Sequence, residues 1–341
     1  MDWKELILEF PQWNLSRVVL QEKGMYRILS QEGEQPAVVS GKYQYEAITP
    51  SDYPAVGDYV MADLNNGDTA VIHKLLPRKS IFLRKAAGTG NSEQAVAANI
   101  DTVFVCMSLN NDFNVRRLER YLSSCWESGA MPVIILTKAD LLENTDEKLL
   151  ETQKVAMGVD VILTSAMEKD GYTQLLPYLT EGKTVAFVGS SGVGKSTLIN
   201  RLLRENRLVT GGLRNDDKGH HTTTHRELIR LENGAMVIDT PGMRELGMWD
   251  AEEGLSNAFS DIEELTESCR FSNCTHTNEP GCQVKAALKE GRLDPDRWQS
   301  YLKLTAENSY YEDSQGYLIA KEKKFKEIAK YNKSRVKPRG K

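Results

Sequence analysis

The sequence predicts three structural parts: an N-terminal OB-like β-barrel, a central α/β domain and a C-terminal, mostly helical domain. Short strand patterns separated by turns fill residues 1–88. Apolar strands alternate with helical stretches over residues 89–254, as in a mostly parallel sheet. Residues 255–341 are polar and helical in pattern, and a cluster of cysteine and histidine interrupts them. A chain of 341 residues is long enough for this multidomain organisation.

The composition is typical of a folded protein without membrane partners. Hydrophobic residues make up 40% of the chain, enough for a buried core. No apolar run approaches the length of a bilayer, and the N-terminus carries acidic residues where a signal peptide would be basic. The five cysteines are odd in number and three are clustered, which favours a reduced cytoplasm and a metal site over disulfides. We expect a cytoplasmic protein, and a monomer because no apolar surface stripe stands out.

The net charge of −5 is unevenly distributed along the chain. Residues 321–341 contain ten Lys and Arg against two Glu, a local charge of +8 that leaves −13 for the rest. A basic tail on an acidic body suits contact with RNA phosphates. A solvated, frayed terminus explains the same charge run equally well.

Five segments between residues 15 and 83 have the short, β-branched character of strands. They are Arg17–Leu20, Met25–Leu29, Ala37–Val39, Asp58–Met61 and Ala70–His73. The turn Asn65-Asn66-Gly67-Asp68 predicts a hairpin between the last two. This spacing favours an OB-like barrel, although an SH3-like barrel would leave a similar pattern.

Apolar and helical segments then alternate, which predicts a mostly parallel sheet covered by helices. The strands are Thr102–Met107, Pro132–Leu136, Val161–Leu163, Thr184–Val188 and Met236–Ile238, and the helices are Val115–Ser128, Lys148–Met157 and Ser196–Leu203. Cys106 lies in an apolar strand and Cys125 in a helix. Both are therefore expected to be buried rather than reactive.

A phosphate-binding loop follows the strand that ends at Val188. Its residues are Gly189, Ser190, Ser191, Gly192, Val193, Gly194, Lys195 and Ser196, which match GxxxxGK[ST], and Thr197 opens the helix beyond them. Glycines allow backbone N–H groups to wrap phosphates, and the helix N-terminus adds positive potential. Lys195 is expected to reach the β and γ phosphates and to serve catalysis, while Ser196 is expected to bind Mg²⁺.

A second phosphate-sensing turn, Asp239-Thr240-Pro241-Gly242, follows another apolar strand. Asp239 is expected to support Mg²⁺, through water, and the Gly242 N–H to face the γ phosphate. The spacing of some 40 residues after a phosphate loop supports this interpretation of an otherwise weak motif.

A guanine-reading motif, Thr137-Lys138-Ala139-Asp140, ends the strand Pro132–Leu136. The Asp140 carboxylate can accept hydrogen bonds from N1–H and N2–H₂ of guanine, a donor pair that adenine lacks. The stem of Lys138 can lie along the base, whereas Thr137 stands where Asn is usual. Ser165-Ala166 ends the next strand, and a backbone N–H near Ala166 is expected to hold guanine O6.

The order of these motifs is rotated relative to an ordinary GTPase, because the base-reading loops precede the phosphate loop. The central part is therefore predicted to be a circularly permuted P-loop GTPase domain. The permutation also joins Gly242 almost directly to residues 255–341. This connection suggests a short covalent path from the γ-phosphate-sensing turn to the C-terminal domain.

The segment Lys218–His225 between the two phosphate motifs is a candidate switch. Thr223 is the preferred threonine for closing the Mg²⁺ shell and contributing to catalysis. Met243 occupies the place where many GTPases have the Gln that orients water. His221 is the nearest catalytic candidate, since an imidazole can hold or deprotonate a water, but a structural or RNA-facing role fits equally well.

A cluster of three thiols and an imidazole predicts a structural zinc site. The ligands are Cys269, Cys274, His276 and Cys282. Four protein ligands leave no open position for substrate, and the segment is too polar to order without a metal. Unlinked cysteines are the alternative, which the spacing and the polarity disfavour.

With these motifs in place, the chain resembles the RsgA (YjeQ) family of circularly permuted GTPases, which act in small-subunit ribosome assembly in bacteria. The rotated motifs and the Cys/His cluster carry the resemblance, together with Leu76–Ser80, Ala98–Asp101 and His221–Thr224. The resemblance implies an OB fold, a permuted GTPase domain and a zinc domain. It also implies hydrolysis of GTP to GDP, stimulated by the 30S subunit and its 16S rRNA during late maturation.

The resemblance further implies one structural Zn²⁺ per chain and Mg²⁺ bound with GTP. It places Lys195, Ser196 and Asp239 on phosphate and Mg²⁺, and Asp140 on guanine. It places His221 and Thr223 in the switch and the three cysteines with His276 on zinc. Thr137 and His220 depart from the commoner Asn and Arg. A GTP-liganded RNA-binding factor with little hydrolysis, or a diverged paralogue with another RNA target, therefore stays open.

Overall fold

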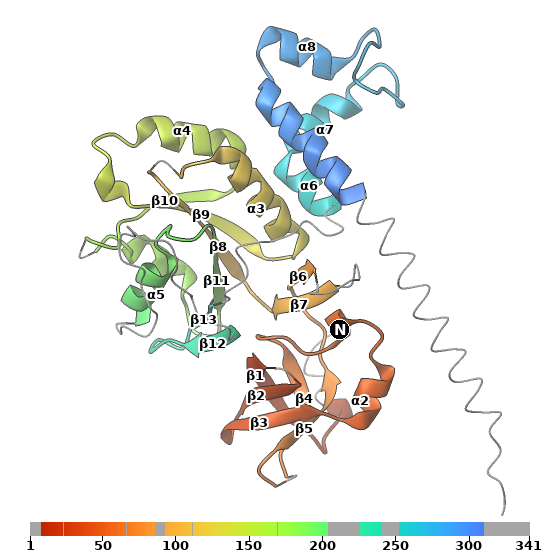
Figure 1. Cartoon of the computed structure of the whole chain (residues 1–341), viewed down its shortest axis with the longest axis vertical. Helices are drawn as coiled ribbons and strands as arrows, with labels where there is room; N and C mark the ends of the chain where they lie inside the picture. Colours follow the sequence, from red (N-terminus) through yellow and green to blue (C-terminus); the bar gives the residue numbers. More distant parts are fainter. Residues whose placement is uncertain are drawn as a thin grey trace, which may run out of the picture.

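The computed structural model describes residues 8–22, 24–65, 67–85, 93–110, 112–168, 170–203, 226–239 and 252–309. Figure 1 shows a small barrel at one end, a sheet with helices in the centre and a group of C-terminal helices that lies against the central part. No helix in these segments combines the length and the apolar character needed to cross a membrane.

The N-terminal part is a closed five-stranded barrel. Its strands are β1 (Asn14–Glu22), β2 (Met25–Ser30), β3 (Gly33–Val39), β4 (Tyr59–Asp63) and β5 (Ala70–Leu75). They pair in the order β1-β2-β3-β5-β4, and β4 closes the barrel on β1. The β3–β5 pairing is parallel, and α2 (Gly41–Glu46) connects β3 to the 3₁₀ helix η1 (Pro50–Asp52) before β4. This arrangement confirms the OB-like barrel over the SH3-like alternative.

The central sheet is mostly parallel, as the alternating pattern predicts. Its strands run in the order β10 (Asp160–Leu163), β9 (Met131–Thr137), β8 (Thr102–Ser108), β11 (Thr184–Val188), β13 (Met236–Asp239) and β12 (Arg226–Arg230). Only β12 is antiparallel within this group. The helical elements are α3 (Val115–Glu127), the 3₁₀ helix η2 (Ala139–Leu141), α4 (Asp146–Val155), the 3₁₀ helix η3 (Thr173–Tyr178) and α5 (Lys195–Leu203).

Both faces of this sheet are covered, which explains why its strands are apolar runs rather than alternating ones. In β8, Val103 and Val105 belong to one core cluster, whereas Phe104 and Cys106 belong to the cluster on the other face. Cys106 and Cys125 are both fully buried, as expected from the sequence. Burial raises the pKa of the Cys106 thiol to about 12, so this thiol stays neutral at physiological pH.

Three strands are absent from the predicted pattern. β6 (Ile81–Lys85) and β7 (Glu93–Ala98) form a separate antiparallel hairpin, and β12 is charged at three of its five positions. The predicted domain boundary at residues 88–89 falls inside this hairpin, in a stretch outside the described residues. Charged or short strands lack the apolar periodicity from which strands are predicted.

A buried arginine joins the barrel to the central domain. Arg17 on β1 donates from Nε to the carbonyl of Gly57 at 3.2 Å and from Nη2 to Thr184 Oγ1 on β11 at 2.7 Å. Leu20 and Gln21 of the same strand also pair with β12, so the barrel continues the edge of the central sheet. A buried guanidinium is stable only where its donors are paired, which fixes this junction.

The segments Leu76–Ser80 and Ala98–Asp101, which carry part of the family resemblance, line the same junction. Arg78 forms a bidentate ion pair with the buried Asp58, with Nη2–Oδ2 and Nε–Oδ1 distances of 2.7 and 2.8 Å. The Asn99 side chain accepts from the Lys79 N–H and donates to the Gly57 carbonyl. These hydrogen bonds therefore help to hold the barrel in place.

The C-terminal part packs on α3 and is helical, as predicted. It contains α6 (Glu252–Ala258), α7 (Ser260–Glu267), α8 (Gln283–Glu290) and a helix over residues 295–309. Phe259 and Ile262 share one core cluster with Leu118 and Leu122 of α3. A Cβ on Gly254 would lie 2.2 Å from the Ser123 carbonyl oxygen, so α6 approaches the backbone of α3 closely.

Substitution of Gly57 tests the barrel junction. Gly57 has φ of 93°, and a Cβ there would lie 2.1 Å from the Ala98 carbonyl oxygen. Gly33 has φ of 114° with no atom within 4 Å, so it is a matched control for backbone strain alone. We predict that Gly57→Ala lowers the free energy of unfolding by at least about 2 kcal/mol more than Gly33→Ala. Urea denaturation of both variants provides the measurement, and equal losses would contradict a tight junction.

Candidate nucleotide site and metal centre

The predicted phosphate loop leaves β11 and enters α5 with three glycines at positive φ. The φ values are 138° for Gly189, 78° for Gly192 and 103° for Gly194, a region that side chains disfavour. A Cβ on Gly189 would also lie 2.3 Å from the Cys106 carbonyl oxygen on β8. The backbone therefore wraps into a compact loop at the carboxyl edge of the sheet, where α/β proteins bind ligands.

Lys195 folds back over this loop. Its Nζ donates to the carbonyl oxygens of Gly189 and Ser190, each at 2.6 Å. These bonds hold the ammonium over the concave side of the loop, where a phosphate would lie. Ser196 and Thr197 follow in the first turn of α5, at the positive end of the helix dipole.

The base-reading motif lies directly beside the phosphate loop, although it is more than 50 residues away in sequence. Thr137 Oγ1 donates to the carbonyl of Val193 in that loop at 2.6 Å. The Thr137 hydroxyl is buried, so it bridges the two loops away from solvent. Thr137, which stands where Asn is usual, therefore supplies a hydrogen bond between the two loops.

The two predicted base loops also hold each other. Ser165 Oγ donates to Asp140 Oδ1 at 2.6 Å, which orients the carboxylate. Lys138 takes a left-handed conformation with φ of 58°, so the chain turns sharply before Asp140. Arg201 of α5 donates to the Ala166 carbonyl at 3.0 Å. The structure thus brings together the predicted guanine-selecting residues at the edge next to the phosphate loop.

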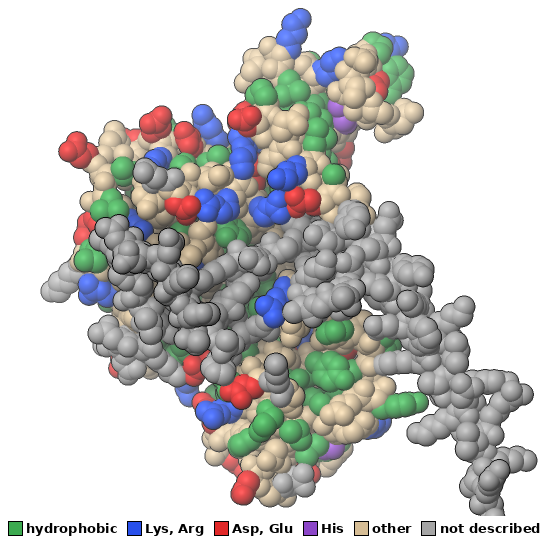
Figure 2. Space-filling model, in the orientation of Figure 1, with side chains coloured by type: hydrophobic (Ala, Val, Ile, Leu, Met, Phe, Trp, Pro, Cys, Tyr) green, Lys and Arg blue, Asp and Glu red, His purple; other side chains and the backbone are tan. Residues whose placement is uncertain are grey.

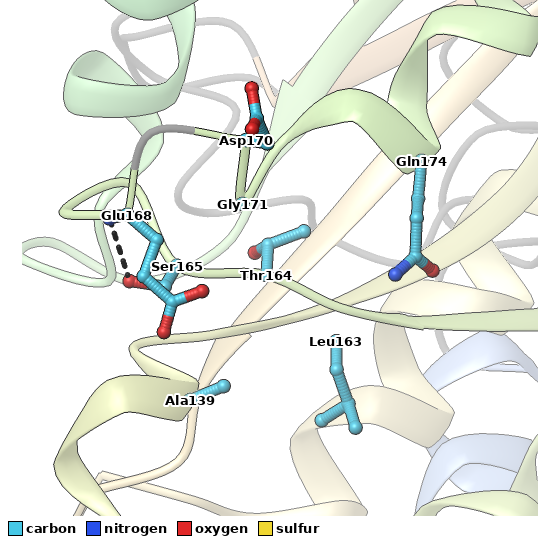
Figure 3. A pocket seen from close by; sticks show the side chains of 8 residues that line it. All are labelled: Ala139, Leu163, Thr164, Ser165, Glu168, Asp170, Gly171 and Gln174. Atoms are coloured by element: carbon cyan, nitrogen blue, oxygen red, sulfur yellow. Dashed lines mark hydrogen bonds between the residues drawn. The ribbon is translucent and has the colours of Figure 1, made fainter.

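A pocket of about 480 Å³ lies beside the base loops (Figure 3). It is lined by Ala139, Leu163, Thr164, Ser165, Glu168, Asp170, Gly171 and Gln174. This set includes Ser165 but neither Asp140 nor any residue of the phosphate loop. The pocket therefore adjoins the predicted nucleotide site and shares Ala139 and Ser165 with its base-reading motifs.

Several predicted residues fall outside the described part of the chain. These are His221, Thr223 and Gly242, together with the neighbouring His220 and Met243. Asp239 ends β13, one strand from the phosphate loop, as the Asp-x-x-Gly interpretation requires. One neighbour of the loop has no motif to mark it: Arg117 on α3, whose guanidinium donates to Ser190 Oγ.

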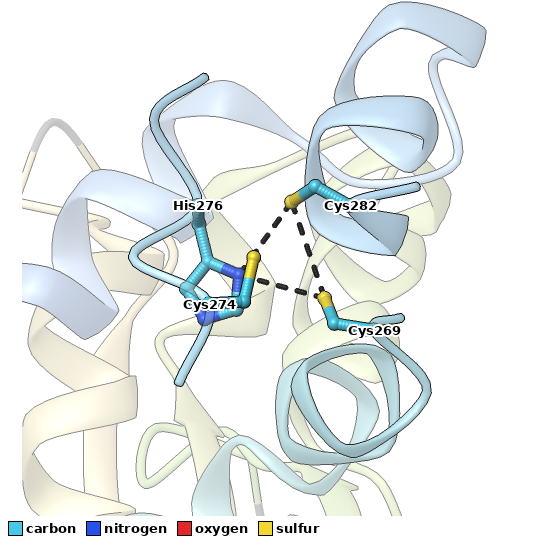
Figure 4. Close-up of side chains that lie close together, drawn as sticks. All are labelled: Cys269, Cys274, His276 and Cys282. Atoms are coloured by element: carbon cyan, nitrogen blue, oxygen red, sulfur yellow. Dashed lines mark hydrogen bonds between the residues drawn. The ribbon is translucent and has the colours of Figure 1, made fainter. Parts of the chain in front are cut away.

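The predicted metal ligands form one cluster (Figure 4). Ligand atoms of Cys269, Cys274, His276 and Cys282 all lie within 4.8 Å of one another. His276 Nδ1 is 3.6 Å from the sulfurs of both Cys269 and Cys282, and those sulfurs are 4.0 Å apart. Tetrahedral zinc with bonds of about 2.0–2.3 Å separates ligand atoms by about 3.6–3.8 Å. The cluster can therefore hold a metal ion.

Backbone and carboxylate contacts shape the metal loop. The N–H of Gln283 points at Cys269 Sγ at 3.4 Å, which favours a thiolate. Glu279 accepts from the N–H groups of Thr275, Thr277 and Asn278, each at 3.0 Å. Hydrogen bonds from the Thr275 hydroxyl, from the N–H of Glu279 itself and from the N–H groups of Thr275 and Asn278 lower the pKa of Glu279 to about 2. Glu279 thus organises the turn that carries Cys274 and His276.

The family model and the relatives found by comparison with known proteins carry the same family name. A family model described as RsgA GTPase matches residues 75–249. "Small ribosomal subunit biogenesis GTPase RsgA 2" of Lactiplantibacillus plantarum is 50% identical over 297 residues, covering 87% of this chain and 84% of that protein. "Small ribosomal subunit biogenesis GTPase RsgA 1" of Oceanobacillus iheyensis is 46% identical over 325 residues, covering 94% of this chain and 92% of that protein.

Two solved structures share the fold. The structure of YjeQ from Thermotoga maritima aligns with a TM-score of 0.65 and 27% identity, covering 86% of this chain and 98% of that chain. The structure of YloQ, described as a circularly permuted GTPase, aligns with a TM-score of 0.62 and 26% identity, covering 88% of this chain and 96% of that chain. The rotated motif order of this chain agrees with that description.

Removal of the Thr137 hydroxyl tests the link between base loop and phosphate loop. Thr137→Val keeps the side-chain shape but leaves the Val193 carbonyl without this donor. We predict about tenfold weaker binding of a fluorescent GDP analogue, since a lost buried hydrogen bond costs about 1–2 kcal/mol. Thr305→Val removes a hydroxyl bonded to Tyr301 in the C-terminal helix and is the matched control. Equal affinity of the Thr137→Val protein and the wild type would contradict the link.

Neutralisation of Glu279 tests the metal loop. Glu279→Gln keeps the size of the side chain but replaces an ionised acceptor by a weaker one. We predict that the variant binds the metal about tenfold more weakly than the wild type, as is typical when a residue that orients metal ligands is replaced. Competition with a zinc-sensitive dye measures the affinity. Glu290→Gln, in an exposed pair with Arg292, is the control and should bind metal as the wild type does.

Proposed function

Because this chain belongs to the RsgA GTPase family and is a GTP hydrolase, we propose that it binds the 30S ribosomal subunit and that 30S stimulates its GTP hydrolysis during late maturation. The relatives are named as small ribosomal subunit biogenesis GTPases, which supports the ribosomal role. In this proposal the protein contacts 16S rRNA and acts as a monomer. It is located in the cytoplasm, where ribosomes assemble.

The observation that carries the proposal is the convergence of three loops on one edge of the sheet. Thr137 bridges to Val193, Ser165 orients Asp140, and Lys195 lies over the phosphate loop. A guanine held by Asp140 would thereby place its phosphates in the loop Gly189–Ser196. Adenine would not satisfy the Asp140 carboxylate in this way, because it lacks the N1–H and N2–H₂ donors.

Each residue has a proposed task. The N–H groups of the phosphate loop and Lys195 bind the β and γ phosphates, and Ser196, Thr223 and Asp239 hold Mg²⁺. The ion neutralises phosphate charge when it is bound. His221 orients the attacking water, because Met243 has no group that can do so.

We propose zinc as the metal of the Cys/His cluster. Three thiolates and one imidazole are the donor set that zinc favours in closed structural sites. Zinc would then hold the segment 269–282 on the end of α8, because Cys282 is the N-cap of that helix. Its role is structural, so it takes no part in hydrolysis.

GTP turnover with and without purified 30S subunits tests the ribosomal role. We predict at least about tenfold faster turnover with 30S, the effect of lowering the barrier by about 1.4 kcal/mol, and no effect of 50S subunits. Lys195→Ala should abolish turnover in both conditions. Equal rates with and without 30S would contradict ribosome stimulation. Tight 30S binding without turnover would instead favour an RNA-binding factor that uses GTP as a structural ligand.

Substitution of Asp140 tests base selection. Asp140→Asn exchanges a double acceptor for a side chain that can donate to the O2 of xanthine. We predict that the variant loses GTP turnover by at least about tenfold and gains turnover of xanthosine triphosphate. Asp146→Asn at the start of α4 removes a charge six residues along the chain and should leave GTP preferred. Competition by ATP as strong as that by GTP in the wild type would contradict the base assignment.

A further inference from the structure

Helix α3 supports the phosphate loop from the side. Besides its bond to Ser190, the Arg117 guanidinium is held by Asp112, whose backbone oxygen and Oδ1 accept from Nη2 at 2.7 and 3.0 Å. Tyr121, one turn further along the helix, also hydrogen bonds with Ser190. Two side chains of α3 therefore fix the second residue of the phosphate loop, and neither belongs to a nucleotide-binding motif.

A second face of α3 carries charged contacts to the C-terminal helices. With 100° between successive residues, Arg116, Glu119 and Arg120 share one side of the helix, and Arg117 lies about 60–160° away from them. Figure 2 shows basic and acidic side chains intermixed over this part of the molecule. One helix thus contacts the phosphate loop on one side and the C-terminal domain on another.

The contacts on this second face are buried and specific. Glu119 is fully buried, and its Oε1 accepts from Arg116 Nη1 at 2.6 Å and from Arg297 Nη1 at 2.7 Å. Arg297 also forms a bidentate pair with Asp261 of α7, at 2.6 and 2.9 Å. Buried pairs of this kind tolerate little displacement, because a separated charge would be left without compensation.

Further contacts prevent α3 from sliding past these helices. Arg120 forms a bidentate pair with Glu307, at 2.7 and 3.1 Å. Glu127 at the end of α3 accepts from the Gly254 N–H at 2.9 Å, where α6 approaches the backbone of α3. A rotation or translation of α3 must therefore carry the C-terminal helices with it.

We propose that Arg117 is a positioning residue for the phosphate loop and that α3 couples this loop to the C-terminal domain. The proposal rests on the proposed function, since it requires guanine nucleotide in the loop. Phosphate draws the loop N–H groups inward, Ser190 moves with them, and Arg117 passes the displacement to α3. By linkage, a shift of the C-terminal domain changes nucleotide affinity through the same helix.

Hydrogen exchange over residues 252–309, with and without saturating GDP and Mg²⁺, tests the coupling. We expect GDP to slow exchange in this region in the wild type. Arg117→Ala and Ser190→Ala should each weaken GDP binding at least about fivefold. When GDP is raised enough to saturate each variant, most of the GDP-dependent slowing of exchange should be lost. Arg117→Lys should restore part of the change, since an ammonium can reach Ser190 but cannot also hold Asp112 at two points.

Two controls separate this proposal from simple destabilisation. Ser190→Ala removes only one oxygen, so this variant is expected to fold and to show the effect of losing the Ser190 contact alone. Arg292→Ala removes an arginine from an exposed pair and should behave as the wild type. GDP binding without any change over 252–309 in the wild type would overturn the proposal, as would a full change in both Arg117→Ala and Ser190→Ala. Failure of GDP to bind at all would overturn the proposed function itself, and this coupling with it.

Discussion

The hydrogen bond from the Thr137 hydroxyl to the Val193 carbonyl joins two loops on which the whole nucleotide site depends. More than 50 residues separate the base-reading loop from the phosphate loop, so no short stretch of chain keeps them together. The parallel sheet brings β9 and β11 to the same edge with β8 between them, and this bond closes the remaining gap. Ser165 then orients Asp140 from the neighbouring strand. The site is therefore formed by several loops that meet at one edge of the sheet, and no single motif forms it alone.

The central sheet also connects the other two parts of the molecule. The barrel is fixed through the buried Arg17, which reaches Thr184 on β11, and through the pairing of β1 with β12. The C-terminal helices are fixed on α3 by Arg297 and Glu119. Each attachment lies within one or two elements of the phosphate loop.

Much of this organisation is predictable from sequence, because its elements are locally encoded. The phosphate loop requires glycines at fixed spacing, the metal ligands are close in sequence, and the buried strands are continuous apolar runs. The strands β6 and β12 are not predicted, because charged residues interrupt the apolar pattern of each. Arg117 and Arg17 escape it for another reason. An isolated arginine resembles any solvated residue until tertiary packing brings Ser190 or Thr184 beside it.

We propose that the rotated motifs form one site and that this site selects guanine through Asp140. Calorimetric titration of the wild type with GDP, IDP and ADP under identical Mg²⁺ conditions tests this most directly. IDP lacks the 2-amino group, so it should bind about tenfold to a hundredfold more weakly than GDP, the cost of one hydrogen bond to a charged acceptor. ADP lacks both donors and should bind more weakly still. Affinities for GDP, IDP and ADP within about twofold of one another would contradict guanine selection by this site.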